Sequence, residues 1–152
     1  MVAIASYVQT ADATTYFATR LYATGWTSAV AGDKDNALIM ATITIDSLPF
    51  KGQKVTPGTR PAFPRYIPLA RGGYYQVDAD DDVLAAAVCE EALELINSGN
   101  SKRLILQNQD VSSFTIDNLS ETFKSISEVP RLTSKRARLL LHPYLAKGVP
   151  IV

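Results

Sequence analysis

The residues that build most catalytic and metal sites are scarce in this sequence. Its 152 residues include one cysteine, Cys89, and one histidine, His142. A single cysteine excludes an internal disulfide framework and a zinc site built from several thiolates. A lone histidine, with no recognisable nucleophile motif around it, removes most metal chemistry and most hydrolytic triads. We therefore expect no catalytic residue, no metal site, no cofactor and no enzymatic activity.

Long hydrophobic runs and net charge are also missing. The longest apolar stretch without a charge, Ala37–Ile45, is far shorter than a membrane span. Residues 1–7 have neither a basic start nor an apolar run of signal length, so we expect a soluble protein of a reducing compartment with no membrane partner. The 15 basic and 15 acidic side chains cancel. This balance argues against a protein that coats nucleic acid through bulk charge.

Helical periodicity and capping residues predict about four helices. The predicted segments cover roughly residues 10–22, 33–48, 83–97 and 134–142. Thr10 and Asp33 begin the first two, and Gly25 and Pro49 follow their ends. The acidic run Asp80–Asp82 opens the third, and Thr133 or Ser134 caps the last helix, which breaks at Pro143.

Prolines and glycines interrupt the stretch from Pro49 to Gly73, which contains five prolines and four glycines. This density predicts no regular element, so we expect a long ordered loop wrapped over the helices. Farther along, Leu104–Gln107 and Val111–Phe123 have strand character, and Asn108–Asp110 is suited to the turn between them. We expect a small β-hairpin there.

The sequence as a whole therefore predicts a mainly α fold, a helical bundle of about four helices with a long proline-rich loop and a small β-hairpin. A hydrophobic content of 47% with 20% charged residues suits a compact core in one domain, 1–152. Within it we expect a helical core at about 10–97, a hairpin insertion at about 102–124, and a C-terminal helix and tail at 131–152.

Charge of each sign is gathered in separate segments. Residues 78–94 contain seven acids and no base, residues 51–71 contain five bases and no acid, and residues 131–152 contain five more bases without an acid. Solvated surface with helix-dipole matching explains this pattern. A second explanation is that an acidic face and a basic face meet head to tail, as in contacts that close into rings.

Three local patterns carry alternative interpretations. Cys89 falls on the apolar face of the third helix, so we expect an inert buried thiol. The second helix has an apolar stripe wide enough to indicate burial on more than one side, in the core or against another subunit. Aromatics and bases alternate at Arg60, Phe63, Arg65 and Tyr66, as in single-strand binders, although an aromatic beside prolines more often anchors a loop.

The order of several short motifs resembles a known family. The motifs are Tyr7–Val8, Ala11–Phe17, Trp26, Asp33–Thr42, Ile45–Asp46, Phe50–Gly52, Phe63–Arg65, Ala87–Leu95 and Leu140–Leu145. This order is similar to that of the head–tail connector proteins of tailed bacteriophages, also called adaptor or head-completion proteins. Relatives with this pattern often carry a DnaT-like single-stranded-DNA-binding label. The similarity covers most of the chain outside roughly residues 98–128.

The resemblance implies a structural virion protein that assembles in the host cytoplasm and ends at the head–tail junction. It implies a homo-oligomeric ring, commonly of twelve copies, that lies beneath the portal protein, extends the DNA channel and receives a stopper, tail-terminator or other tail protein. Packaged DNA would pass through the lumen without sequence-specific binding. A single-stranded-DNA-binding module is the alternative function.

The resemblance and the charge pattern together predict three sets of contact residues. The subunit interface would pair the bases with the acids: Lys51, Lys54, Arg60 and Arg65 with Asp80, Asp81, Asp82, Glu90 and Glu94. The C-terminal segment would bind the portal through Arg138, Leu141, His142, Tyr144, Leu145, Val149 and Ile151. The candidates for facing DNA are Lys102, Arg103 and Lys124.

Overall fold

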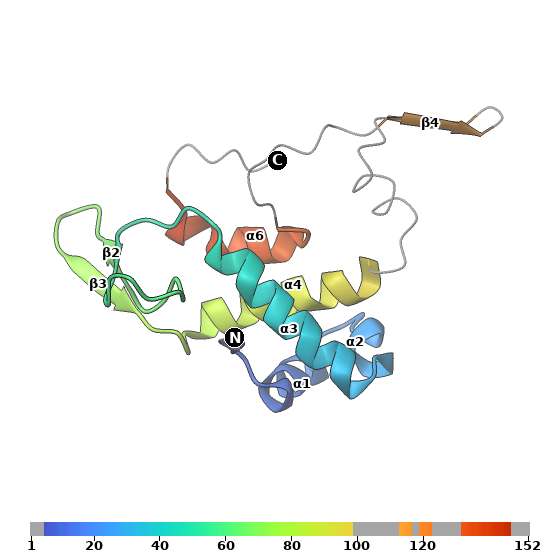
Figure 1. The fold of residues 1–152 in the computed structure, drawn as a ribbon, viewed down its shortest axis with the longest axis horizontal. Coiled ribbons are helices and arrows are strands. Elements are labelled where there is room, and N and C mark those ends of the chain that lie inside the picture. The colour runs from blue at the N-terminus through green and yellow to red at the C-terminus, as the bar shows by residue number, and fades with distance from the viewer. Residues whose placement is uncertain (1–4, 99–112, 117–118, 123–131, 147–152) are drawn as a thin grey trace.

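A computed structural model describes residues 5–98, 113–116, 119–122 and 132–146 (Figure 1). Helices account for about half of these residues, and a three-stranded antiparallel sheet accompanies them. The helices are α1 (Thr10–Ala18), α2 (Thr24–Ser28), α3 (Ala31–Asp46), α4 (Asp82–Ser98) and α6 (Lys135–Leu141), followed by the 3₁₀ turn η1 (His142–Tyr144). The strands are β1 (Gln53–Lys54), β2 (Arg65–Pro68), β3 (Tyr74–Val77), β4 (Ser113–Ile116) and β5 (Leu119–Thr122).

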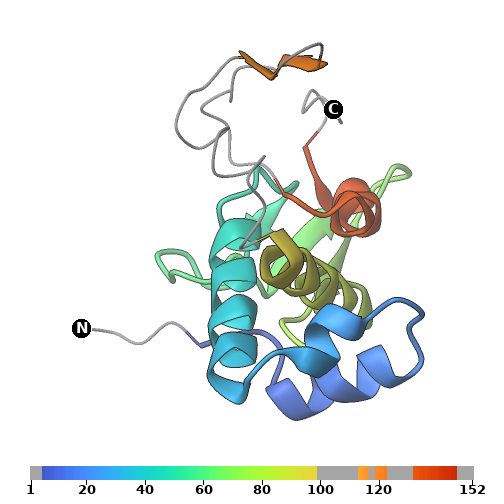
Figure 2. The same cartoon turned by 90° about the vertical axis from the view of Figure 1, so that its right-hand side faces the viewer.

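Helix α4 lies at the centre of the helical part. Figure 2 shows α3, α6 and the α1–α2 pair around it, and α3 and α6 make its most extensive packing contacts. Its apolar side chains face these neighbours and are buried: Leu84, Ala87, Val88, Cys89, Ala92 and Leu93. Because Glu90 and Glu91 are buried too, the middle of α4 is covered on nearly every side.

The helix starts follow the capping chemistry of the sequence. Asp81 Oδ1 accepts hydrogen bonds from the amides of Val83 and Leu84 at 3.0 and 3.1 Å, which caps α4. Ser134 Oγ accepts from the amide of Ala137 at 3.2 Å, which caps α6. Both caps satisfy amides that the first turn of a helix leaves without partners. The predicted caps of these two helices are therefore confirmed.

The prediction that one helix continues to about residue 22 is wrong. Helix α1 ends at Ala18, and a separate short helix, α2, contains Gly25. Tyr22 between them has a φ of 60°, a left-handed conformation that a right-handed helix cannot contain. Trp26 of α2 is buried, with its ring centroid 4.8 Å from that of Phe17, so it packs at the junction of these helices.

The prediction that Pro49–Gly73 forms no regular element is also wrong. Strand β2 lies in this stretch and is central in a sheet of order β1–β2–β3, with Lys54 opposite Arg65 and Tyr66 opposite Gln76. The prolines escape the usual conflict with a sheet because they sit outside the strands or at the end of β2. Pro68, the last residue of β2, pairs only with Tyr74 of β3.

The antiparallel pair β4–β5 also lies at different residues from the predicted hairpin. Strands β4 and β5 both fall within Val111–Phe123, the segment expected to be one strand, and they pair antiparallel with Ile116 opposite Leu119. The predicted turn at Asn108–Asp110 and the strand Leu104–Gln107 lie outside the described residues.

Gly52 is required where the loop approaches the sheet. Its φ is +70°, and a Cβ atom there would lie 1.8 Å from the carbonyl oxygen of Tyr66. Gly58 offers a matched control, because its φ is also positive at +82° but nothing lies within 4 Å of its added Cβ.

We expect Gly58→Ala to cost about 1 kcal/mol through its left-handed backbone. Gly52→Ala should cost about 2 kcal/mol more, because β1 and β2 must separate to make room. Urea unfolding followed by the fluorescence of Trp26 measures both. Equal losses for the two variants would contradict the close approach.

Candidate functional site

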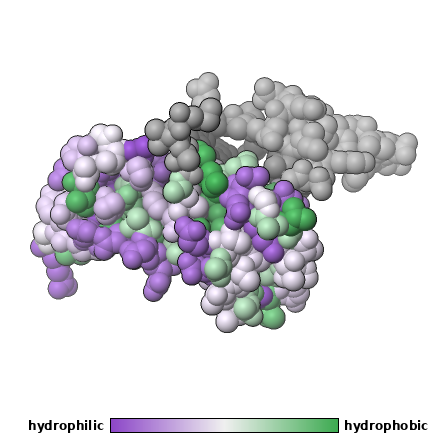
Figure 3. Space-filling view, turned by 60° about the horizontal axis from the view of Figure 1, so that its bottom comes forward, coloured by the Kyte–Doolittle hydropathy of each residue, from purple (hydrophilic) through white to green (hydrophobic). Residues whose placement is uncertain are grey.

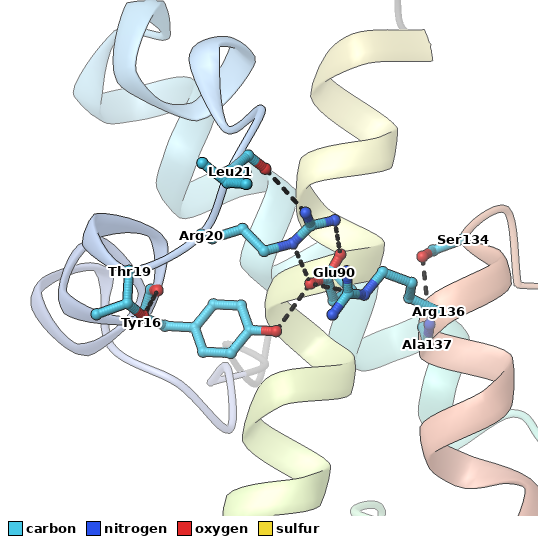
Figure 4. A network of polar contacts seen from close by, with 8 residues as sticks. All are labelled: Tyr16, Thr19, Arg20, Leu21, Glu90, Ser134, Arg136 and Ala137. Carbon is cyan, nitrogen blue, oxygen red and sulfur yellow. Dashed lines mark hydrogen bonds and ion pairs between the residues drawn. The ribbon is translucent and has the colours of Figure 1, made fainter.

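A buried ionic cluster on α4 ties three helices together (Figure 4). The Glu90 carboxylate is 3% exposed. It accepts hydrogen bonds from Tyr16 Oη at 2.8 Å and from Arg20 Nε and Nη2 at 2.7 and 3.0 Å. Arg136 of α6 approaches the same carboxylate, with its Nε 3.5 Å from Oε1. Glu90 therefore joins α1 and the residues just after it to α6.

The cluster keeps Glu90 ionised despite its burial. Burial by itself raises the pKa of a carboxyl group, but the hydrogen bonds from Arg20 and Tyr16 and the positive charges of Arg20 and Arg136 outweigh it. The net result is a Glu90 pKa below the ordinary value. Its charge is thus used inside the subunit, although Glu90 was predicted to lie at the subunit interface.

The neighbouring acid, Glu91, attaches the start of α6. Its carboxylate accepts from the amides of Thr133 and Ser134 at 2.9 and 2.8 Å, and the side chain is buried. Burial raises the pKa of Glu91 against the lowering effect of these amides. The two oxygens hold the chain at the point where α6 begins, next to its N-terminal dipole.

A second buried charge, Arg65, organises the proline-rich segment. The Arg65 guanidinium donates to four main-chain carbonyls, those of Phe50, Lys51, Gly52 and Ala62, over 3.0–3.4 Å. Burial lowers its pKa, and the side chain faces away from solvent. Arg65 was also predicted to lie at the subunit interface, and in the structure its donors are occupied within the loop.

Phe63 belongs to an aromatic cluster in the core. Its ring centroid lies 4.8 Å from that of Phe50, 6.2 Å from Tyr7 and 6.5 Å from Tyr144. Because Phe63 is buried, it has no face on which a base could stack. Of the four residues in the alternating basic and aromatic pattern, only Arg60 and Tyr66 are exposed.

The C-terminal segment folds back onto the loop that follows α3. The amide of Lys51 donates to the carbonyl of Tyr144 at 2.8 Å, and that of Ala146 donates to the carbonyl of Pro49 at 2.9 Å. Leu141, which was predicted to bind the portal, is buried in the core. His142 is exposed, while Arg138, Tyr144 and Leu145 are half-buried.

The remaining predicted contact residues are distributed as follows. Arg60, Asp80 and Asp82 are exposed, whereas Lys51, Lys54, Asp81 and Glu94 are half-buried. Val149, Ile151 and the three candidates for facing DNA, Lys102, Arg103 and Lys124, lie outside the described residues.

The outer face of the sheet presents aromatic side chains that the loop prediction missed. Tyr66 and Tyr74 project from this face, where the strand pairing places Gln53, Tyr66 and Gln76 in one row and Pro68 and Tyr74 in the next. Tyr74 is 66% exposed. The signal that could have indicated this strand is the period-two alternation in Arg65–Pro68, in which the first and third residues are buried.

A second exposed apolar surface lies between α1 and α3. Leu21 and Tyr22 are 76% and 88% exposed, and Val30 at the start of α3 is also exposed. On α3, Met40 and Ile43 are exposed as well, so the wide apolar stripe predicted for that helix is only partly buried within the subunit. Figure 3 shows apolar side chains at the surface over the sheet and over the helices, between larger hydrophilic areas.

The part of the chain that the structure describes has no grouped metal ligands beside these surfaces. Those residues contain no cluster of three or more His, Cys, Asp or Glu side chains that could hold a metal ion. Cys89 is buried, and burial raises the pKa of its thiol to about 12, which makes it inert as predicted. None of the described helices is long and apolar enough to span a membrane.

Comparison with known families decides the membership of the chain. A family model described as "Putative DnaT-like ssDNA binding protein" matches residues 2–151. The chain belongs to this DnaT-like family. No curated protein and no solved structure matches it significantly.

In this DnaT-like chain, Arg65→Met should remove the donors that hold four loop carbonyls. We expect a loss of about 2–3 kcal/mol in unfolding free energy, because several carbonyls lose partners at once. Arg60→Met, a matched change at an exposed arginine of the same segment, should cost less than about 0.5 kcal/mol. Urea unfolding compares the two variants, and similar losses would show that Arg65 does not organise the loop.

The Glu90 cluster makes a prediction about pH. Because the folded pKa of Glu90 is lowered, the ionised form stabilises the fold fully above the unfolded pKa of about 4.3. This contribution disappears as the pH falls through the lower folded pKa.

Glu90→Gln should therefore cost about 2 kcal/mol at neutral pH, and the difference from the unmodified protein should vanish in acid. Thermal unfolding as a function of pH measures this change. Glu94→Gln on the same helix is the control and should show little difference at any pH. A deficit for Glu90→Gln that persists unchanged in acid would contradict the ionised cluster.

Proposed function

We propose that this chain is the subunit of a homo-oligomeric ring that acts as a head–tail adaptor in a tailed bacteriophage. The order of its sequence motifs supports the class, and the exposed apolar surfaces support assembly. The ring, of about twelve copies as in the resembling proteins, would lie between portal and tail. DNA would pass through its lumen without sequence-specific contacts.

The observation that carries the proposal is the exposure of large apolar side chains on separate faces of a small subunit. Tyr66, Leu69 and Tyr74 are exposed on the sheet, and Leu21 and Tyr22 are exposed beside α1. Gathered apolar surface of this kind is typical of contacts with other proteins. Two different surfaces on each copy support a head-to-tail arrangement, which closes into a ring when the rotation allows.

The C-terminal helix supports a separate portal contact. Glu91 anchors its start, and the loop after α3 holds its end through main-chain hydrogen bonds. The exposed His142 and the half-buried Arg138 and Tyr144 lie on this anchored part. In the proposed adaptor they form the portal-facing side together with the residues after Ala146, and the opposite side receives the stopper or tail-terminator protein.

Single-stranded-DNA binding is a second candidate, and one surface favours it. Tyr66 and Tyr74 lie on one exposed sheet face, and Arg71 lies in the adjoining turn between β2 and β3. Aromatic side chains beside bases can stack nucleotides and neutralise phosphates. The family description names this activity, although the buried Phe63 and Arg65 take no part in it.

A nonsense mutation in the gene tests the adaptor. We expect DNA-filled heads and separate tails in the lysate under electron microscopy, with joining restored when the full chain is supplied from a plasmid. Loss of viral DNA synthesis with normal joining of the particles that form would overturn the adaptor.

A labelled oligonucleotide separates the second candidate from the first. The adaptor proposal expects weak binding that does not change on Tyr74→Ala, measured by fluorescence anisotropy. Tight, salt-sensitive binding that Tyr74→Ala abolishes, with Tyr22→Ala as the matched control, would favour the DNA-binding function instead.

A further inference from the structure

The described surface has a basic aromatic end, here called the sheet end. It comprises the outer face of β1–β3 and the β2–β3 turn, with Tyr66, Leu69 and Tyr74 as its exposed apolar side chains. Between Ser47 and Val77 the chain contains five bases and no acid. Arg65 is turned inward, and the four others, Lys51, Lys54, Arg60 and Arg71, are exposed or half-buried.

A second region, here called the helix end, carries exposed apolar side chains and exposed acids. Leu21 and Tyr22 lie in the connection between α1 and α2, Val30 lies just before α3, and the exposed acids Asp12, Asp33 and Asp35 lie on α1 and α3. The two bases in this part of the chain are engaged within the subunit. Arg20 binds Glu90, and Lys34 Nζ lies 5.6 Å from the ring centroid of Trp26. Arg136 of α6 also approaches Glu90 and its side chain is 60% exposed, so three exposed acids face one exposed base in this region.

The acidic run before α4 is a poorer complement for the bases of another copy. Asp81 caps α4, and Asp78 accepts a hydrogen bond from Gln76 of β3. These acids lie where β3 leads into α4, next to the basic strands of their own subunit (Figure 1). Two acids farther along, Glu90 and Glu91, are buried.

The two ends lie on different sides of the molecule. In Figure 1 the sheet occupies one end of the long axis, while α1 lies near the middle of the picture and α2 lies farther from the sheet. A two-fold contact would place like charges opposite one another at either end, which is unfavourable. A contact between unlike ends pairs acids with bases and aromatic with aliphatic side chains.

We propose that the helix end of one copy docks on the sheet end of the next copy. This inference rests on the proposed ring and names the surfaces that close it. Leu21 and Tyr22 are held ready for the contact, because Arg20 Nη1 donates to the carbonyl of Leu21 at 2.8 Å while its other donors bind Glu90. Tyr22 keeps a left-handed φ of 60°, and backbone strain of this kind is concentrated at functional sites.

Disulfide trapping tests the contact directly. Tyr22→Cys marks the helix end and Tyr74→Cys marks the sheet end, while the native Cys89 stays silent because it is buried. Under mild oxidation, a mixture of the two single variants should give covalent dimers, and the double variant should give a ladder that ends in a closed ring. Each single variant alone should stay uncrosslinked. Strong self-crosslinking of either one would show a two-fold contact and overturn the proposal.

Charge reversal gives an independent readout. Arg71→Glu at the sheet end should weaken self-association about tenfold in sedimentation equilibrium at low salt, and added salt should shrink this difference. Lys135→Glu on α6 is the matched control at an exposed base outside both ends, and it should leave association unchanged. Equal effects of the two reversals would overturn the assignment of the surface.

The outcomes separate this inference from the ring itself. Rings that form while the mixed Tyr22→Cys and Tyr74→Cys variants give no crosslink would overturn the assigned ends and leave the proposed function standing. A chain that stays monomeric at every concentration and on its assembled particle would overturn both. Protection of the Tyr74→Cys thiol by an oligonucleotide but not by a second copy would assign the sheet end to DNA and overturn the inference.

Discussion

Two adjacent carboxylates buried on one helix set the arrangement of the helices in this chain. Consecutive residues of a helix point about 100° apart, so Glu90 and Glu91 face different neighbours. Glu90 meets Arg20 and Tyr16 on one side and Arg136 on another, and Glu91 meets the amides at the start of α6. A buried carboxylate without partners costs several kcal/mol. Folding must therefore bring α1 and α6 to α4 together.

The sequence predicts correctly those features that depend only on residues close to one another in the chain. The caps of α4 and α6 need only a hydroxyl or carboxylate at the right spacing, and Asp81 and Ser134 show it. The two acids of α4 could not be recognised as buried, because their partners come from distant parts of the chain and from main-chain amides. Glutamates in the middle of a helix are more typical of solvated surface.

The prediction for the sheet failed for a different reason. The density of proline in residues 49–73 argues against strands when residues are counted, but the position of each proline decides the outcome. Pro64 precedes β2 and Pro68 ends it, so the central strand loses little of its pairing. Arg65 then gathers the carbonyls of a loop that makes few regular hydrogen bonds of its own. The donor that stabilises this loop is a charged side chain, which a surface interpretation of the sequence assigns to solvent.

Because some charged residues are buried, the charge pattern along the sequence does not describe the charge that the surface offers for assembly. Once Glu90, Glu91 and Arg65 are assigned to the interior, the charge that remains outside is segregated differently from the charge along the sequence. Within the acidic stretch before and within α4, Glu90 and Glu91 are buried, while Asp80 and Asp82 stay exposed together with the acids near α1 and α3. Which charged residues lie on the surface can be determined only after the internal pairs are known.

The same internal pairs connect stability to assembly. Arg20 holds Glu90 with one part of its guanidinium and the carbonyl of Leu21 with another, so the cluster that fixes α1 on α4 also fixes the exposed loop after α1. In the proposed ring, a subunit whose contact loop is ordered before docking loses less entropy on association. Apolar area then supplies most of the affinity, and the unlike charges select the partner end. The buried Glu90 carboxylate thereby serves the outer contact through the geometry it imposes, without its own charge reaching the neighbouring copy.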